Sequence, residues 1–139
     1  MIKFTNSFYL VDSNIFIDFL LATKDDRDLN KVFNQPVYLN FAIFTETINF
    51  IQNRISFKEA LEAVSRVIEN PNLFIFLPIT SRDLHQAVEI NNKYYVSKIG
   101  FNDSLILSQA QNYSLKVLTQ DIRMNIYPNV EVENPFTES

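Results

Sequence analysis

The chain has 139 residues, of which 47% are hydrophobic and 20% are charged, and its formal net charge is −4. These values are typical of one globular domain, which we assign to residues 1–139 with a core at about 8–132. A single glycine, Gly100, excludes a glycine-rich phosphate loop. The absence of cysteine excludes a disulfide scaffold, a cysteine-ligated zinc site and a thiol nucleophile.

Charge and hydropathy also limit the partners. No apolar run approaches the roughly 20 residues that a membrane helix needs, and residues 1–7 lack the apolar core of a signal peptide. We therefore expect a cytoplasmic protein without a membrane partner. The negative net charge disfavours nonspecific nucleic-acid binding through a basic surface, unless a bound metal ion reverses the local field.

A buried strand over residues 8–12 opens the predicted fold. Its apolar run ends in Asp12, and Ser13 or Asn14 starts a helix. The buried stripe of this helix is formed by Ile15, Phe16, Phe19 and Leu20. The charged segment 24–28 is predicted to be a solvated loop and the first turn of a short helix. Ligand sites in open α/β sheets lie at the carboxyl ends of strands, so Asp12 is a candidate site residue.

Strands and helices continue to alternate through the middle of the chain. A strand over 36–40 precedes a helix over 41–54, and the capping pattern of Ser56 and Glu59 opens the next helix. The inward-facing residues of that helix are expected to be Ala60, Leu61, Val64, Val67 and Ile68. The apolar run 73–79 is typical of a strand that is covered on both faces.

The last third of the chain repeats the alternation. A second capping pattern over 80–83 opens a helix, and Asn102 with Asp103 is predicted to cap the following one. A strand over 116–119 leads to Asp121, and a short last strand covers 130–132. This alternation predicts an α/β fold with a mainly parallel sheet of four to five strands between two layers of helices.

Four acidic residues follow predicted strands or lie on predicted helices: Asp12, Glu46, Asp103 and Asp121. If they converge, their like charges need a counter-charge, which a divalent cation can supply. Oxygen ligands suit Mg²⁺ or Mn²⁺, and such sites serve phosphodiester chemistry. Three of these acids also have a purely structural interpretation: a helix N-terminal charge for Asp103, a turn residue for Asp121 and a solvent-facing side chain for Glu46. Likewise, Ser13 either caps a helix or orients an acid, and Thr119 is a second hydroxyl that could orient one.

Four segments carry a family resemblance: Val11-Asp12-Ser13-Asn14, Phe44-Thr45-Glu46, Phe101-Asn102-Asp103 before an apolar helix with Ala110, and Leu118-Thr119-Gln120-Asp121. In order and context they resemble the PIN-domain ribonucleases, especially the VapC-like toxins of toxin–antitoxin pairs. The resemblance covers about residues 8–132. It implies a PIN-like three-layer α/β/α sandwich and a Mg²⁺- or Mn²⁺-dependent endoribonuclease.

The resemblance also assigns roles. It implies that Asp12, Glu46 and Asp103 hold the metal directly or through water, and that Asp121 completes the cluster or binds a second ion. It further implies an RNA substrate, a cognate antitoxin protein and a homodimer.

The residues after Asp12 fit two other functions poorly. A phosphoacceptor receiver domain needs paired acids after the first strand, where Asp12 is followed by Ser13. A haloacid-dehalogenase-type phosphatase needs a second Asp two residues on, where Asn14 stands. The remaining alternative is a catalytically silent module of the same fold that binds RNA or protein.

Overall fold

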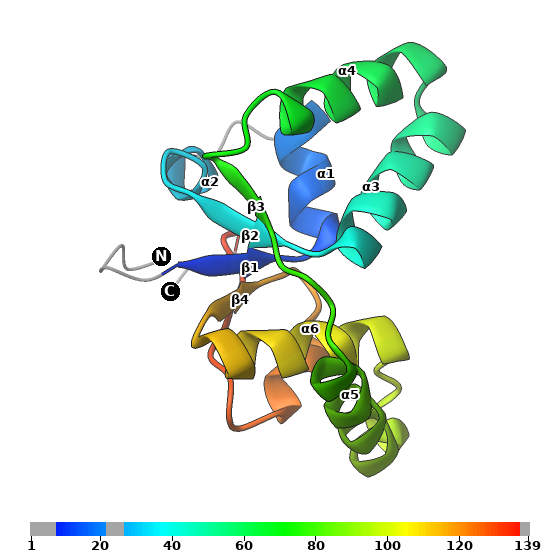
Figure 1. Ribbon diagram of the computed structural model, residues 1–139, viewed down its shortest axis with the longest axis vertical. Coiled ribbons are helices and arrows are strands. Elements are labelled where there is room, and N and C mark those ends of the chain that lie inside the picture. Colours follow the sequence, from blue (N-terminus) through cyan, green and yellow to red (C-terminus); the bar gives the residue numbers. More distant parts are fainter. Residues whose placement is uncertain (1–7, 22–26, 137–139) are drawn as a thin grey trace.

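A five-stranded parallel sheet forms the centre of the computed structural model, which describes residues 8–21 and 27–136 (Figure 1). The strand order is β3-β2-β1-β4-β5, and each neighbouring pair is parallel. The strands are β1 (Tyr9–Val11), β2 (Val37–Leu39), β3 (Phe74–Phe76), β4 (Lys116–Leu118) and β5 (Val132–Glu133). The parallel sheet confirms the predicted topology, with boundaries shortened by one to three residues at most strands.

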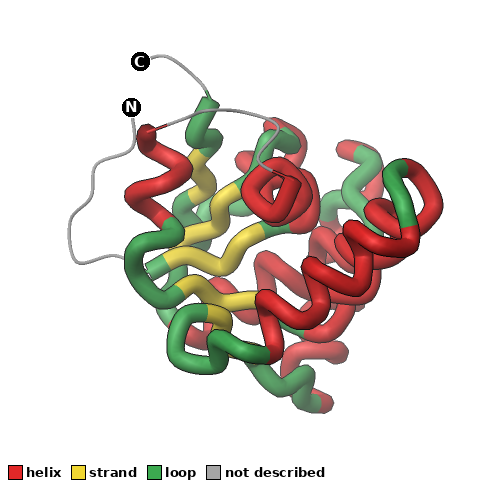
Figure 2. The backbone as a smooth tube through the Cα atoms, turned by 90° about the horizontal axis from the view of Figure 1, so that it is seen from above, coloured by secondary structure: helices red, strands yellow, loops and turns green. Residues whose placement is uncertain are grey.

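Helices cover both faces of this sheet. They are α1 (Ser13–Leu21), α2 (Arg27–Val32), α3 (Phe41–Arg54), α4 (Phe57–Ile68), α5 (Ser81–Lys93) and α6 (Phe101–Tyr113), with 3₁₀ helices η1 (Tyr95–Ser97) and η2 (Ile122–Ile126). Helices α1, α3 and α4 lie on one face, and α5 and α6 lie on the other (Figure 1). Seen from above, the strands run side by side between these layers (Figure 2). The predicted three-layer α/β/α sandwich is confirmed. None of the helices in the described ranges is long and apolar enough to cross a membrane.

Aromatic packing fixes α1 against the sheet. The Phe16 ring meets Phe74 of β3 edge-on at 5.6 Å between centroids, and Phe19 stacks on Phe33 at 3.7 Å. Leu10 and Val11 of β1 are fully buried in the same core cluster as Phe16, Phe33 and Phe74. Edge-on and offset aromatic pairs add about 0.5–1.5 kcal/mol each beyond their area burial. The turn from β1 into α1 is therefore anchored on both sides.

Helix starts follow local side-chain chemistry, with one correction. Thr80 caps α5 and forms the predicted capping box with Asp83. The prediction that Asn102 and Asp103 cap α6 was wrong, because Gly100 is the capping residue. Asp103 is the third helical residue, and its carboxylate accepts the Gly100 N–H at 3.2 Å from inside the helix. An acidic side chain can accept a free backbone N–H of the first turn either from the capping residue or from the third helical residue. The sequence alone therefore does not tell which of these two positions Asp103 occupies.

Two predictions about buried faces were also wrong. The run 73–79 is not covered on both faces, because β3 lies at the edge of the sheet and Phe76 is 41% exposed. On α4, Leu61 and Ile68 were expected to face inward but are 53% and 64% exposed. The small side chains of that helix, rather than its large ones, pack against α3. The expected loop over 24–28 lies mostly outside the described residues.

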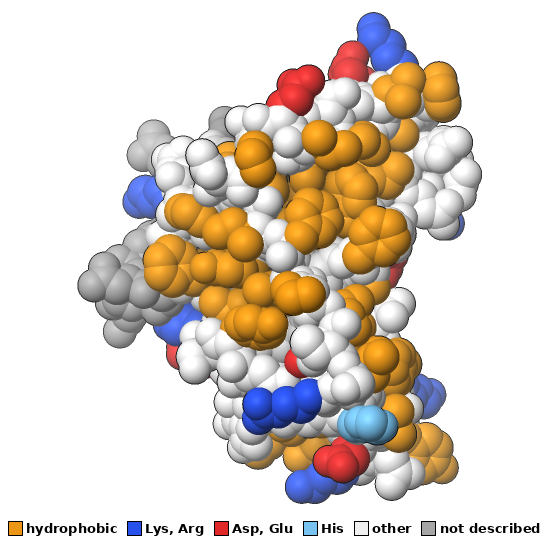
Figure 3. Space-filling model, viewed as in Figure 1, with side chains coloured by type: hydrophobic (Ala, Val, Ile, Leu, Met, Phe, Trp, Pro, Cys, Tyr) orange, Lys and Arg blue, Asp and Glu red, His pale blue; other side chains and the backbone are white. Residues whose placement is uncertain are grey.

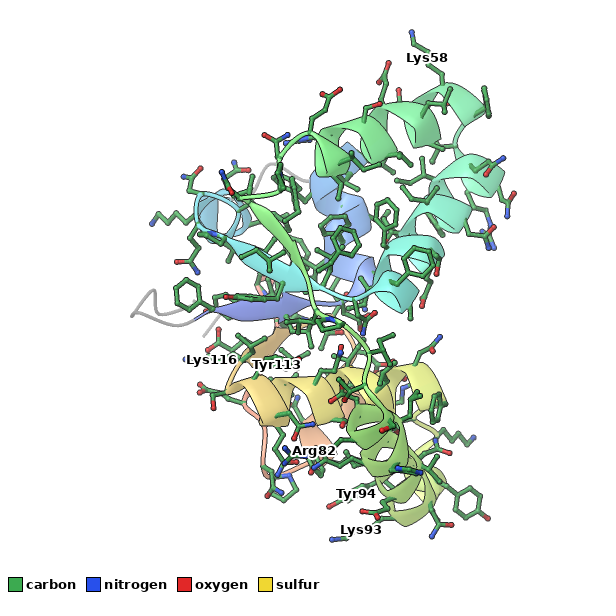
Figure 4. The ribbon with its side chains drawn as sticks, viewed as in Figure 1. Lys58, Arg82, Lys93, Tyr94, Tyr113 and Lys116 are labelled. Carbon is green, nitrogen blue, oxygen red and sulfur yellow. The ribbon has the colours of Figure 1, made fainter. Side chains whose placement is uncertain are left out.

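The two ends of the sheet differ in charge balance. At the N-terminal end, Lys116, which is labelled in Figure 4, forms ion pairs of 3.3 Å with Glu131 and Glu133. The Tyr9 hydroxyl donates to Glu133 at 2.8 Å in the same cluster. These acids are thus engaged in holding β4 and β5 together. The C-terminal end carries the candidate residues.

Candidate active site

Asp12 lies where β1 passes into α1. Its main-chain N–H donates to the Leu118 carbonyl of β4 at 2.9 Å, and its carbonyl accepts from Ile15 and Phe16 of α1. The residue is only 6% exposed, although burying a carboxylate is costly. The chain thus fixes an acid in the interior at the C-terminal edge of the sheet. This edge is also where the strand order reverses direction, between β1 and β4.

The Thr119 hydroxyl connects two of the predicted acids. It donates to Asp12 Oδ2 at 2.8 Å and accepts from Asn14 Nδ2 and from the Asp121 N–H, both at 3.1 Å. Thr119 is 1% exposed and directly follows β4. A hydroxyl has one proton to donate and two lone pairs, so all of its capacity is used. Thr119 therefore orients the Asp12 carboxylate and restrains the backbone at Asp121.

Ser13 connects Asp12 to α3. Its N–H donates to Asp12 Oδ1 at 2.7 Å, and its hydroxyl donates to Glu46 Oε1 at 2.9 Å. The interpretation of the Ser13 hydroxyl as a helix cap was wrong, because Asp12 precedes the first helical residue and the hydroxyl reaches across to α3 instead. The alternative role, orienting an acid, describes this contact. Glu46 is exposed on α3, yet its carboxylate is held toward the β1–α1 turn.

Asp103 comes to the site from the opposite helical layer. It lies in the first turn of α6 and is partly buried. Burial raises the pKa of its carboxyl, and the charges of Asp121 and Glu46 raise it further, against the lowering effects of the Gly100 N–H and of Arg123. Asp103 therefore accepts the N–H of the capping residue Gly100 and also contributes negative charge to the site.

Asp121 is paired with a cation. Arg123 Nε and Nη2 donate to its carboxylate at 2.9 and 2.6 Å, and Arg123 Nη1 donates to the Lys98 carbonyl at 3.1 Å. The bonds from Arg123 lower the pKa of Asp121 below its usual range. Asp121 also begins η2 by accepting the Arg123 N–H at 3.0 Å. Its structural interpretation as a turn residue thus holds alongside its position at the site.

The neighbouring acids act on the pKa of Asp12. Burial raises the pKa of Asp12 to about 6, outweighing the lowering effects of the Thr119 hydroxyl and the Ser13 N–H, and the charges of Asp103 and Glu46 raise it further. The structure therefore brings the four predicted acids to one edge of the sheet. Among the described residues, no three Asp, Glu, His or Cys side chains are already arranged to hold a metal ion.

Two further side chains support this edge, although neither was predicted to be a site residue. Asn14 Oδ1 accepts the Gln120 N–H at 3.0 Å, which adds to its bond to Thr119. Gln120 Nε2 donates to the Asn14 carbonyl at 3.2 Å and to Asp18 Oδ2 at 2.9 Å. Both residues stand beside predicted acids in the sequence, and that adjacency was the only available signal.

A groove adjoins the acids along α3. Its volume is about 730 Å³. Its lining includes Phe41, Thr45, Glu46, Asn49, Gln52 and Asn102. Glu46 is therefore shared between the acidic edge and the groove.

Comparison with protein families and solved structures adds independent findings. The PIN domain model matches residues 9–129. No curated protein matches the chain. The structure of VapC20 from Mycobacterium tuberculosis, a Sarcin-Ricin loop cleaving toxin, matches with a TM-score of 0.74 and 16% identity over 91% of this chain and 99% of that chain.

Two further solved structures are similar as well. FitAcB from Neisseria gonorrhoeae gives a TM-score of 0.73 at 22% identity, covering 92% of this chain and 98% of that chain. VapBC-1 from nontypeable Haemophilus influenzae gives 0.73 at 16% identity, covering 94% and 99%. The TM-scores establish a shared fold with these structures. Because the family model spans nearly the whole described domain, the chain belongs to the PIN-domain family.

Proposed function

We propose that this protein is a Mg²⁺- or Mn²⁺-dependent endoribonuclease and the toxin of a toxin–antitoxin pair. The observation that carries the proposal is the buried Asp12, which is held by Thr119 and Ser13 and whose pKa is raised by burial and by the charges of Asp103 and Glu46. Concentrated negative charge at the C-terminal edge of a parallel sheet is costly unless it serves a ligand. Membership of the PIN family and the fold shared with known toxins support the same function.

The donor set suits a hard divalent cation. It consists of carboxylate oxygens backed by hydroxyl groups, which is the chemistry preferred by Mg²⁺ and Mn²⁺. Asp12, Glu46 and Asp103 would hold the ion directly or through water, and Asp121 would complete the cluster or take a second ion. When bound, the ion would lower the pKa of a water molecule and offset charge on the scissile phosphate.

The chain's own groups would position these parts. Thr119 and Ser13 fix the carboxylates of Asp12 and Glu46 in orientation. Arg123 has a side chain that is 51% exposed, so its guanidinium can also donate to a substrate phosphate. The groove along α3 has Glu46 in its lining and would take a single-stranded segment of RNA next to the cleaved bond.

The direct test is cleavage of single-stranded RNA by the purified protein. We expect cleavage with Mg²⁺ or Mn²⁺ and none after EDTA is added, because the metal supplies the activated water. The Asp103→Asn variant should be inactive with either metal. Product sizes on a denaturing gel report the result.

Two observations favour the silent-module alternative: Arg123 already neutralises Asp121, and no metal arrangement is preformed in the described residues. Absence of cleavage, together with stoichiometric binding to a protein partner, would replace the enzyme proposal with that alternative.

Exposed apolar surface supports the proposed protein partners. Hydrophobic side chains spread over β3 and the adjoining helices on the face shown in Figure 3. The exposed fractions of Phe41, Leu61, Ile68 and Phe76 are 64%, 53%, 64% and 41%. Large exposed apolar areas mark interaction sites. We propose that the chain forms a homodimer and binds a small antitoxin protein.

Light scattering should therefore give twice the 16.2 kDa mass of one chain. A monomer at tens of micromolar would contradict the homodimer. The product of a neighbouring reading frame that encodes a small DNA-binding protein should copurify with the chain and suppress cleavage. Failure of that product to bind would remove it as the antitoxin.

A further inference from the structure

A buried pair of amide side chains joins the two helical layers. Asn40, which caps α3, and Gln109 of α6 are both 0% exposed. Asn40 Nδ2 donates to Gln109 Oε1 at 2.8 Å, while Asn40 Oδ1 accepts the Ile43 N–H at 2.8 Å. Gln109 Nε2 donates to the Pro78 carbonyl at 3.1 Å. One amide thus starts α3 and also holds α6.

Asp83 fixes the orientation of Gln109. The Asp83 residue is 2% exposed. Its carboxylate accepts hydrogen bonds from Gln109 Nε2 at 3.3 Å and from Asn112 Nδ2 at 2.9 Å. Reversing the Gln109 amide would set its oxygen against the Asp83 carboxylate and the Pro78 carbonyl. The amide oxygen of Gln109 must therefore face Asn40.

The amide pair connects the helices that carry two of the site's acids. Asn40 precedes Glu46 by six residues on α3 (46 − 40), and Gln109 follows Asp103 by six on α6 (109 − 103). Ser13 already ties Glu46 to the β1–α1 turn. Among hydrogen bonds of the described residues, none joins Asp103 to another of the four acids. The position of Asp103 therefore depends on how α6 sits against the rest of the fold.

We propose that Asn40 and Gln109 are positioning residues that set the approach of α3 to α6, and with it the separation of Glu46 and Asp103. The inference rests on the proposed metal-dependent function. Buried amides need several partners in fixed directions, so this pair specifies one helix arrangement, whereas an apolar pair would tolerate several. Groups that orient metal ligands without touching the metal typically change its affinity about 10–100-fold when removed.

The test compares two amide-to-leucine variants on the same helix. Gln109→Leu removes the bridge to α3. Asn112→Leu removes a bond to the same Asp83 carboxylate, and a bond to Gln86, but it leaves the bridge to α3 intact. We expect both variants to lower the melting temperature. Only Gln109→Leu should weaken Mn²⁺ binding, by about tenfold in titration calorimetry without RNA.

A second measurement does not depend on metal. The chain has no cysteine, so spin labels can be attached at Thr45→Cys and Asn102→Cys, which line the same groove on α3 and α6. Gln109→Leu should broaden or shift the distance between the labels, and Asn112→Leu should leave it unchanged.

An unchanged distance and unchanged Mn²⁺ affinity in Gln109→Leu would overturn the inference and leave the pair a merely stabilising contact. Equal changes in both variants would overturn it too. If the unsubstituted protein binds no Mn²⁺, the proposed function fails, and the label distance alone decides the inference.

Discussion

Replacing Asp12 with Asn is expected to abolish RNA cleavage while making the metal-free protein more stable at neutral pH. The loss should exceed about a hundredfold, because even groups that only orient a metal ligand cost 10–100-fold when removed. The gain arises because burial, Asp103 and Glu46 together penalise the ionised Asp12 carboxylate. Asn carries no charge and has nearly the same shape.

The direction of the pH dependence follows from the raised pKa. Between the ordinary value of 3.8 and about 6, the folded protein keeps the Asp12 proton and the unfolded chain has lost it. The Asp12 contribution to stability is therefore present below pH 4 and is lost as the pH rises through 6. A shift of one pKa unit corresponds to about 1.4 kcal/mol of unfolding free energy. Because Asn makes some of the hydrogen bonds of Asp12 poorly, we expect Asp12→Asn to raise the free energy of unfolding by about 1–2 kcal/mol at pH 7.5.

Urea unfolding at pH 7.5 and pH 4 measures this difference without Mg²⁺. Glu62→Gln, an exposed acid on α4, is the matched control and should change neither stability nor cleavage. Addition of Mg²⁺ should stabilise the unsubstituted protein and not Asp12→Asn. If Asp12→Asn retains full cleavage, Asp12 is not a metal ligand. If it is destabilised at pH 7.5, the raised pKa is wrong.

Removing the Thr119 hydroxyl is expected to have the second largest effect. Thr119→Val keeps the shape of the side chain but leaves Asp12 Oδ2, Asn14 Nδ2 and the Asp121 N–H without this partner. Unsatisfied buried groups cost about 1–3 kcal/mol each, and partial relaxation should leave a net loss of about 2–4 kcal/mol in unfolding free energy. Cleavage should fall about 10–100-fold, as for other groups that orient a ligand.

The pH profile of cleavage separates orientation from simple instability. The Thr119 bond lowers the pKa of Asp12, so its loss should move the acid limb of the profile to higher pH. Thr119→Ser keeps the hydroxyl and should restore most of the activity. Ser65→Ala removes an exposed hydroxyl of α4, outside the groove and the site, and it should have little effect. Equal cleavage by Thr119→Val and the unsubstituted protein would rule out the orienting role.

Sequence predicted the local features of this protein well. The capping box of Thr80 and Asp83, the bounds of α3 and the position of Asp12 at the end of a buried strand all appear in the structure. Each depends on residues within a few positions, where hydrogen-bond geometry and apolar spacing act directly. The start of α6 was misplaced because one acid can serve either of two neighbouring positions.

The candidate site depended on contacts that no local pattern encodes. The bond from Thr119 to Asp12 joins residues 107 apart, that from Ser13 to Glu46 spans 33, and that from Asn40 to Gln109 spans 69. These contacts exist because β1 lies between β2 and β4, a strand order fixed by the packing of whole helices on the sheet. The exposure of Phe76 on the edge strand has the same origin.

The sequence by itself thus determined most strand ends and helix starts, and it placed Asp12, Asp103 and Asp121 next to such positions and Glu46 within a helix. Only the tertiary structure decided that a buried threonine hydroxyl holds Asp12, that Ser13 reaches α3 and that Arg123 neutralises Asp121. The physical reason is the sequence separation of the residues that interact. Helix caps and strand ends arise from interactions between near neighbours, whereas the charge density of a site arises from strand order and helix packing across the whole chain.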